Sequence, residues 1–109
     1  MCQYQTLYHN DKTGYVIRCT DCEKIQLAYS NLVMTFSHED FDAFRFWIKK
    51  IRDEQPEGKN PAIRSIMIPA PCQGIQLLLS PRELDDLVAM LETADTELQS
   101  VQLISLFHP

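Results

Sequence analysis

Four cysteines are the residues of this chain whose type and spacing are best suited to chemistry. Cys19 and Cys22 form a C-x-x-C motif, a spacing found both in metal-binding loops and in thiol redox pairs. A zinc ribbon has a second C-x-x-C pair, and this sequence has none. The other two cysteines, Cys2 and Cys72, occur singly and lie far from the motif in sequence. The fold therefore decides whether these thiols meet.

An N-terminal hairpin is predicted to bring one of the single cysteines to the motif. Strand-forming residues precede and follow a turn-rich segment, N-D-K-T-G at residues 10–14. A turn centred in this segment pairs residues whose numbers sum to 23 or 24, which places Cys2 opposite Asp21 or Cys22. His9 would lie at the other end of the hairpin, roughly 23 Å from Cys2 at a rise of about 3.3 Å per residue. Three thiols, without this histidine, are therefore expected to converge.

A fourth ligand for a tetrahedral metal ion has to come from elsewhere in the chain. Cys72 is the best candidate, although a histidine or water would also serve. Four thiolates, from Cys2, Cys19, Cys22 and Cys72, would make a closed structural zinc site, whereas three thiolates and water leave an open position.

Two other interpretations of the cysteines stay open. Reduced thiols that only fill the interior are the plain alternative, because cysteine is often a small buried apolar residue. A redox pair at Cys19 and Cys22 is the third interpretation. Such pairs usually lie at a helix N-terminus, where the dipole lowers the thiol pKa, and this motif lies between predicted strands.

No other set of residues predicts catalysis. The sequence has no phosphate-binding loop, no dinucleotide-binding G-x-G-x-x-G and no G-x-S-x-G nucleophile motif. The three histidines are far apart in sequence. Paired carboxylates at residues 39–40 and 85–86 fall in the first turns of predicted helices, where acidic side chains are electrostatically favourable. The sequence therefore favours a non-enzymatic role.

The elements that would position the thiols are indicated by hydrophobic spacing. Residues 25–29 and 32–36 alternate in the way of two half-buried strands, joined by a two-residue turn at 30–31. Ser37 then caps a helix that should end near residues 52–54. Its apolar face is formed by Phe41, Phe44, Ile48 and Ile51.

The same order of elements then repeats. Residues 63–68 and 75–79 are expected as strands, and S-P-R-E at residues 80–83 is a capping box with proline at the first helical position. A shift of 43 residues superimposes the caps and apolar positions of the two halves, which indicates two ββα pseudo-repeats. A chance match between two strand–cap–helix segments is the alternative.

These elements predict one α+β domain over residues 1–109. Its parts are an N-terminal hairpin at residues 1–23 that contains the C-x-x-C motif, a first ββα unit at 24–54 and a second at 62–109. We expect the hairpins to build an antiparallel sheet with both helices packed on one face, because a lone hairpin is marginally stable in water.

Composition disfavours several classes of partner. The net charge is −5 and the ten basic residues are scattered, which disfavours nucleic acid because phosphate binding depends on Lys and Arg. No apolar run approaches the ~20 residues of a membrane helix, and no signal peptide is visible. We therefore expect a cytoplasmic protein whose thiols stay reduced.

The C-terminal segment indicates a protein partner. Apolar residues continue through Leu98 and Val101 into L-I-S-L-F at residues 103–107. If this segment is helical, it extends several turns beyond the first helix, and an exposed apolar end would favour a homodimer. The alternative is a tail that folds back onto its own sheet.

The segment G-Y-V-I-R-C-T-D-C at residues 14–22, with Cys2 before it and I-Q-L-A at 25–28 after it, resembles a family of small uncharacterised bacterial proteins. This family is a domain of unknown function found mainly in Bacteroidetes. The resemblance covers most of the chain, including residues 80–84. It implies a bacterial origin and no established activity, and it supplies no catalytic residue.

The sequence as a whole predicts a scaffold or protein-interaction module of unknown specific role, stabilised by zinc bound to its cysteines. Its expected partners are a second copy of the chain or another protein. The alternative function is a thiol-based redox sensor or oxidoreductase that uses Cys19 and Cys22.

Overall fold

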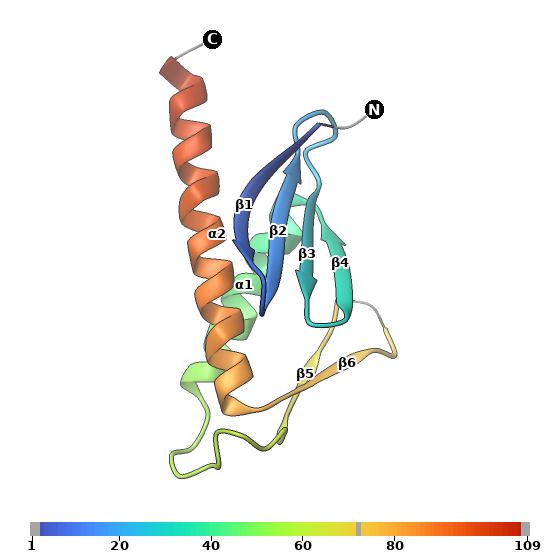
Figure 1. Ribbon diagram of the computed structural model, residues 1–109, viewed down its shortest axis with the longest axis vertical. Coiled ribbons are helices and arrows are strands. Elements are labelled where there is room, and N and C mark those ends of the chain that lie inside the picture. The colour runs from blue at the N-terminus through green and yellow to red at the C-terminus, as the bar shows by residue number, and fades with distance from the viewer. Residues whose placement is uncertain (1–2, 72, 108–109) are drawn as a thin grey trace.

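The computed structural model describes residues 3–71 and 73–107 (Figure 1). Within these ranges the chain forms six strands and two helices, which confirms the predicted α+β class. In chain order the elements are β1 (Tyr4–Asn10), β2 (Gly14–Cys19), β3 (Ile25–Tyr29), β4 (Leu32–Phe36), α1 (His38–Asp53), β5 (Ile66–Pro69), β6 (Gln76–Leu79) and α2 (Pro81–Phe107).

The strands form two sheets, so the expectation of a single sheet is wrong. β1 to β4 make a four-stranded antiparallel sheet in sequential order, and β5 and β6 pair only with each other within the described residues. One residue, Ser80, separates β6 from α2, and α2 packs beside β1 and β2. This short connection holds the β5–β6 hairpin below the large sheet, near the β3–β4 turn, so that it does not pair with β4 (Figure 1).

The N-terminal hairpin has the predicted register. Tyr4 pairs with Cys19 and His9 pairs with Tyr15, so the paired numbers sum to 23 before an irregularity at residues 6–8 and to 24 after it. β2 then pairs with β3, which makes this hairpin part of the large sheet.

Gly14 allows β2 to start close against β3. Its φ is +141°, and a Cβ at this position would clash with the carbonyl oxygen of Ala28. Only glycine fits such an approach, because any side chain would meet backbone atoms of the neighbouring strand.

Both helices begin with the predicted serine caps. The hydroxyl of Ser37 accepts a hydrogen bond from the backbone N–H of Asp40 at 3.1 Å, and α1 ends at Asp53, inside the predicted range. At α2 the capping box is complete: the backbone N–H of Glu83 donates to Ser80 Oγ at 3.1 Å, and that of Ser80 donates to Glu83 Oε1 at 2.9 Å.

One hydrophobic core joins the two sheets and the two helices. α1 lies behind the large sheet and α2 runs alongside β1 (Figure 1). Fully buried side chains in this core come from β2, β3, both helices and β5, and include Val16, Leu27, Phe41, Ile48, Ile68, Leu87 and Leu91. Because the small sheet contributes to the same core, the second hairpin depends on the rest of the domain for its stability.

A charged cluster joins the two helices at the surface of the core. Arg45 of α1 lies 3.2 Å from Glu92 and 3.6 Å from Asp95, both on α2. Among the residues that the structure describes, Asp95 is the one buried charged residue, and Gln99 Nε2 donates a hydrogen bond to it at 2.9 Å.

α2 is a single helix of 27 residues, so the C-terminal segment does not fold back as far as residue 107. At about 1.5 Å per residue it is roughly 40 Å long. No helix in residues 3–71 and 73–107 combines the length and apolar character needed to cross a membrane.

Candidate functional site

The C-x-x-C motif begins at Cys19, the last residue of β2, and continues into the β2–β3 loop, at the end of the large sheet where the chain enters β1. The loop is closed by backbone hydrogen bonds from the Cys19 N–H to the Lys24 carbonyl at 2.8 Å and from the Glu23 N–H to the Cys19 carbonyl at 3.0 Å. The backbone N–H and Oγ1 of Thr20 both donate to the carbonyl oxygen of Gln3, at 2.9 and 3.1 Å. The loop is therefore tied to the residue that precedes β1.

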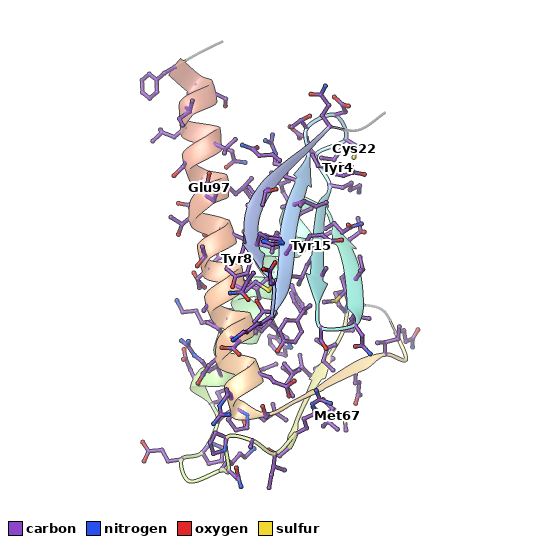
Figure 2. The ribbon with its side chains drawn as sticks, in the orientation of Figure 1. Tyr4, Tyr8, Tyr15, Cys22, Met67 and Glu97 are labelled. Atoms are coloured by element: carbon purple, nitrogen blue, oxygen red, sulfur yellow. The ribbon has the colours of Figure 1, made fainter. Side chains whose placement is uncertain are left out.

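The two cysteines of the motif share a hydrogen bond. The backbone N–H of Cys22 donates to Sγ of Cys19 at 3.3 Å. Cys19 is only 3% exposed, whereas Cys22 is exposed at the upper end of the large sheet, near Tyr4 (Figure 2). The loop can therefore present one shielded and one accessible sulfur ligand.

The residue after the motif has a left-handed backbone. Glu23 has a φ of 60°, and it directly follows Cys22. For a residue with a Cβ this conformation costs about 1–2 kcal/mol, so the loop holds it through its other contacts. Sequence reasoning missed this feature because glutamate, unlike glycine or asparagine, has no preference for positive φ.

The predicted ligand set is only partly described by the structure. Cys2 and Cys72 lie outside the described residues. His9 lies at the far end of the N-terminal hairpin from Cys19, as expected from the register. Among the residues that are described, no group of three or more His, Cys, Asp or Glu side chains could hold a metal ion.

The chain on either side of residue 72 lies away from the C-x-x-C loop. Pro71 lines a groove together with Asp40 and Trp47 of α1. β6 lines a different cavity, against the β3–β4 turn. This turn follows the last residue of β3, whereas the C-x-x-C loop precedes the first, and four steps along β3 span roughly 13 Å. Figure 1 likewise shows the β5–β6 hairpin and the β2–β3 loop at different ends of the large sheet.

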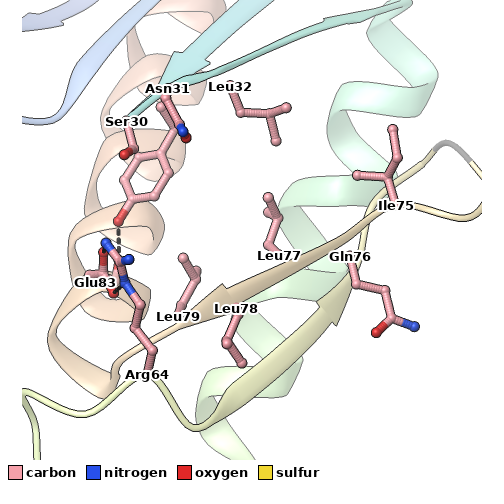
Figure 3. A pocket seen from close by; sticks show the side chains of 11 residues that line it. Ser30, Asn31, Leu32, Arg64, Ile75, Gln76, Leu77, Leu78, Leu79 and Glu83 are labelled. Atoms are coloured by element: carbon pink, nitrogen blue, oxygen red, sulfur yellow. Dashed lines mark hydrogen bonds and ion pairs between the residues drawn. The ribbon is translucent and has the colours of Figure 1, made fainter.

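A cavity of about 310 Å³ lies between β6 and the β3–β4 turn (Figure 3). The phenol of Tyr29 donates to the backbone carbonyl of Glu83 at 3.1 Å, and the Glu83 carboxylate forms two hydrogen bonds with Arg64, at 2.9 and 3.0 Å. Burial, with a smaller contribution from Glu83, raises the pKa of Tyr29 to about 12. The Arg64 hydrogen bond lowers the pKa of Glu83. These groups bind one another, so their arrangement serves the start of α2 and does not indicate a ligand.

The C-terminal end of α2 is a second candidate, as a binding surface. Val101 is half-buried, and the helix then presents four exposed apolar side chains. Their exposed fractions are 57% for Leu103, 59% for Ile104, 75% for Leu106 and 74% for Phe107. Figure 1 shows this end of α2 extending past the strands. It is an apolar surface without a partner inside the described chain.

Comparison with known protein families gives a match over nearly the whole chain. The model of the "Family of unknown function (DUF6686)" matches residues 1–107. No curated protein and no solved structure matches the chain. Since the match includes both hairpins, both helices and the C-x-x-C loop, the chain belongs to this family of unknown function.

Proposed function

We propose that the protein is a non-enzymatic interaction module that pairs with a second copy of itself through the end of α2. The observation that carries the proposal is the run of exposed apolar side chains at residues 103–107 on a continuous helix. Exposed apolar surface of this kind is unfavourable in water and is buried by association.

The charge pattern supports a second copy as the partner. Glu97 is the last charged side chain before the end of α2, and residues 98–107 are all neutral. Two such segments, each roughly 15 Å long, can pack antiparallel without bringing like charges together. Because both copies present the same surface, a twofold dimer buries the exposed apolar side chains of both copies in one interface.

The proposed setting follows from charge and from the cysteines. A net charge of −5 does not favour phosphate-rich partners, so neither nucleic acid nor an anionic membrane is included. We place the protein in the cytoplasm, where cysteines are maintained as thiols.

Sedimentation equilibrium of the purified chain over a range of concentrations tests the proposal. The wild type should be a dimer at micromolar concentration, and the Leu103→Glu/Leu106→Glu variant should be a monomer with an unchanged circular dichroism spectrum. Phe46→Glu is the matched control, because Phe46 is a 66% exposed apolar residue of α1 outside the proposed surface. A monomeric wild type, or equal dissociation by Phe46→Glu, would contradict the proposal.

The alternative function is a thiol-based redox sensor or oxidoreductase that uses Cys19 and Cys22. The 3.3 Å contact between the Cys22 N–H and Cys19 Sγ favours it, because it brings the two residues together. The burial of Cys19 and the position of the loop between strands oppose it, since reactive pairs need access and a helix dipole.

Mass mapping after low doses of hydrogen peroxide separates the two functions. In a redox pair the two thiols lose two electrons and two protons to form a disulfide, while peroxide is reduced to water. A reversible Cys19–Cys22 disulfide at stoichiometric peroxide supports the redox function. Thiols that remain unmodified under these conditions reject it.

A further inference from the structure

β6 is an edge strand whose backbone groups are partly directed away from β5. Within the described residues the small sheet contains β5 and β6 alone, so each strand has one free edge. The backbone N–H of Ala70 donates to the carbonyl of Ile75 at 3.1 Å, and residues along an antiparallel pair alternate between bonded and non-bonded positions. The register therefore directs the backbone N–H and C=O groups of Gln76 and Leu78 toward the free edge of β6.

The two free edges of the small sheet differ in their protection against pairing. Edge strands are commonly blocked by proline or by charged side chains. β5 ends in Pro69, which has no N–H, and the same alternation directs this position toward the free edge of β5. β6 contains neither proline nor a charged residue, and residues 65–81 as a whole are uncharged. The edge of β6 is therefore the unblocked edge.

A cavity of about 310 Å³ follows this edge (Figure 3). Its lining includes five successive residues, 75–79. Because successive side chains of a strand point to opposite faces, a cavity that contacts all five residues runs along the strand and not over one face. The β3–β4 turn and Leu32 form the opposite wall, and no described residue of β5 lines the cavity. The space therefore lies on the side of β6 where another strand would pair.

The surroundings of the edge favour an uncharged occupant. On the outer face of the small sheet, Leu78 and its cross-strand partner Met67 are exposed by 51% and 62%. Leu77 contributes an apolar side chain to the inner face. At the α2 end of the cavity, Arg64 and Glu83 bind each other through two hydrogen bonds, so these charges do not select a charged ligand. Apolar side chains on either face of an added strand would contact leucine.

We propose that an extended, uncharged segment of a partner protein pairs with the edge of β6 and enters this cavity as a third strand of the small sheet. Main-chain hydrogen bonds to Gln76 and Leu78 position the segment, and its apolar side chains fill the cavity. An isolated two-stranded sheet is marginally stable in water, and a third strand adds both pairing and buried apolar surface.

The position of the cavity favours a partner over this chain or a second copy. The described ends of the chain, residues 3 and 107, lie at the other end of the molecule from β6 (Figure 1). The β6 strand of a second copy would bring its own β5 with it, and the β3–β4 turn opposite the edge leaves space for a narrow extended segment. The proposal does not depend on the dimer formed through the end of α2.

Binding of short synthetic peptides to the full-length protein tests the proposal. The probe is the tightest binder from a pool of acetylated, amidated peptides of about six residues built from Val, Ile, Leu, Thr and Ser. Its dissociation constant, measured by fluorescence anisotropy, should lie below about 1 mM. The same peptide with a central Glu or Lys should bind about tenfold more weakly, because burial of an unpaired charge is unfavourable.

Two proline variants distinguish the edge of β6 from the rest of the small sheet. Leu78→Pro removes an outward N–H and places a ring against the approaching strand, so it should weaken peptide binding by about tenfold or more. Met67→Pro is the matched control, because Met67 pairs with Leu78 and its N–H faces the other edge. This control should change the affinity by less than about twofold. Circular dichroism checks that both variants are folded.

Hydrogen exchange of the wild type gives a readout that needs no variant. The bound peptide should slow exchange of the Gln76 and Leu78 amides by about tenfold or more and leave that of Met67 unchanged. The proposal is overturned if no uncharged peptide binds, if these two amides stay unprotected, or if Met67→Pro weakens binding as much as Leu78→Pro.

Sedimentation equilibrium of Leu78→Pro separates this surface from the end of α2. The variant should keep the oligomeric state of the wild type. Dissociation of the dimer by Leu78→Pro would assign the edge of β6 to a second copy and would contradict a partner segment. A monomeric wild type that still binds the peptide would contradict the α2 dimer alone, so the two failures are distinguishable.

Discussion

Ser80 and Glu83 exchange two hydrogen bonds across the first turn of α2, each donating its backbone N–H to the other's side chain. Arg64 also binds the Glu83 carboxylate, and Tyr29 donates to the Glu83 carbonyl. One residue therefore joins the start of the helix to the segment before β5 and to the end of β3.

The Ser80 cap should be measurable in the stability of the domain. Ser80→Ala removes the acceptor for the Glu83 N–H and should lower the free energy of unfolding by about 1 kcal/mol. Urea denaturation followed by circular dichroism gives this value. Ser100→Ala, an exposed serine on the same helix, should change it by less than about 0.5 kcal/mol. Equal losses in the two variants would show that the cap contributes nothing specific.

Glu83 should make the stability depend on pH in the acidic range. Its pKa is lowered in the folded chain, chiefly by the hydrogen bond from Arg64, so the folded state favours the charged carboxylate. This stabilisation is complete above the pKa of glutamate in the unfolded chain, ~4.3, and is lost as the pH falls through the lower folded value.

Glu83→Gln tests this pH dependence, because the amide keeps an oxygen acceptor for Ser80 and does not titrate. Urea midpoints measured between pH 6 and pH 3 should fall more steeply for the wild type than for the variant. Parallel curves for the two proteins would show that Glu83 does not contribute to acid sensitivity.

Gly14 should tolerate no side chain. Gly14→Ala places a Cβ against the Ala28 carbonyl in addition to the strain of a positive φ, so we expect a loss of about 3 kcal/mol or more, or failure to fold. Gly74 also has a positive φ, +86°, but a Cβ there meets nothing within 4 Å. Gly74→Ala should therefore cost only about 1–2 kcal/mol. Thermal melts of both variants give the two losses of stability. The loss in Gly74→Ala reports the backbone strain alone, and the additional loss in Gly14→Ala reports the clash with the neighbouring strand.

Arg45 should stabilise the contact between the helices. Arg45→Ala leaves Asp95, whose side chain is 12% exposed, without its cation, and should lower stability by about 1–3 kcal/mol. Arg52→Ala is the control, because Arg52 pairs with the exposed Asp53, and it should change stability by less than about 1 kcal/mol. Added salt should reduce the difference in stability between the Arg45→Ala and Arg52→Ala variants only slightly, since the Arg45 cluster is partly shielded from water.

Features set by neighbouring residues were predictable from the sequence. The serine caps, the length of α1 and the register of the N-terminal hairpin each follow from a few adjacent side chains, and the structure confirms them. The positive φ in the β3–β4 turn falls on Ser30, although Asn31 is the residue that tolerates it better. The pairing of Tyr29 with Leu32 fixes the turn regardless of this preference.

The division into two sheets was not predictable in the same way. The spacing of strand-forming residues does not predict whether the β5–β6 hairpin pairs with β4, because this pairing depends on where α2 packs. β5 also begins three residues later than expected: Ile63 is 56% exposed and precedes the strand, which starts at Ile66. An apolar residue in a connector has the same sequence signature as one in a strand.

The C-x-x-C motif of the candidate site was predictable from the sequence, but the conformation of its loop was not. The C-x-x-C spacing and the hairpin register place Cys19 and Cys22 at one end of the sheet from sequence alone. The hydrogen bond to sulfur and the left-handed Glu23 depend on how the loop closes. No residue type in the loop predicts the hydrogen bond to sulfur or the left-handed conformation of Glu23.

The single-residue connection between β6 and α2 couples the position of the small sheet to that of the helix. Because α2 also packs against β1, β2 and α1, a shift of the β5–β6 hairpin would have to be accommodated along the whole buried length of the helix. The buried side chains of α2 end at Leu98, so the turns that follow, as far as Phe107, can change their surroundings without disturbing this coupling.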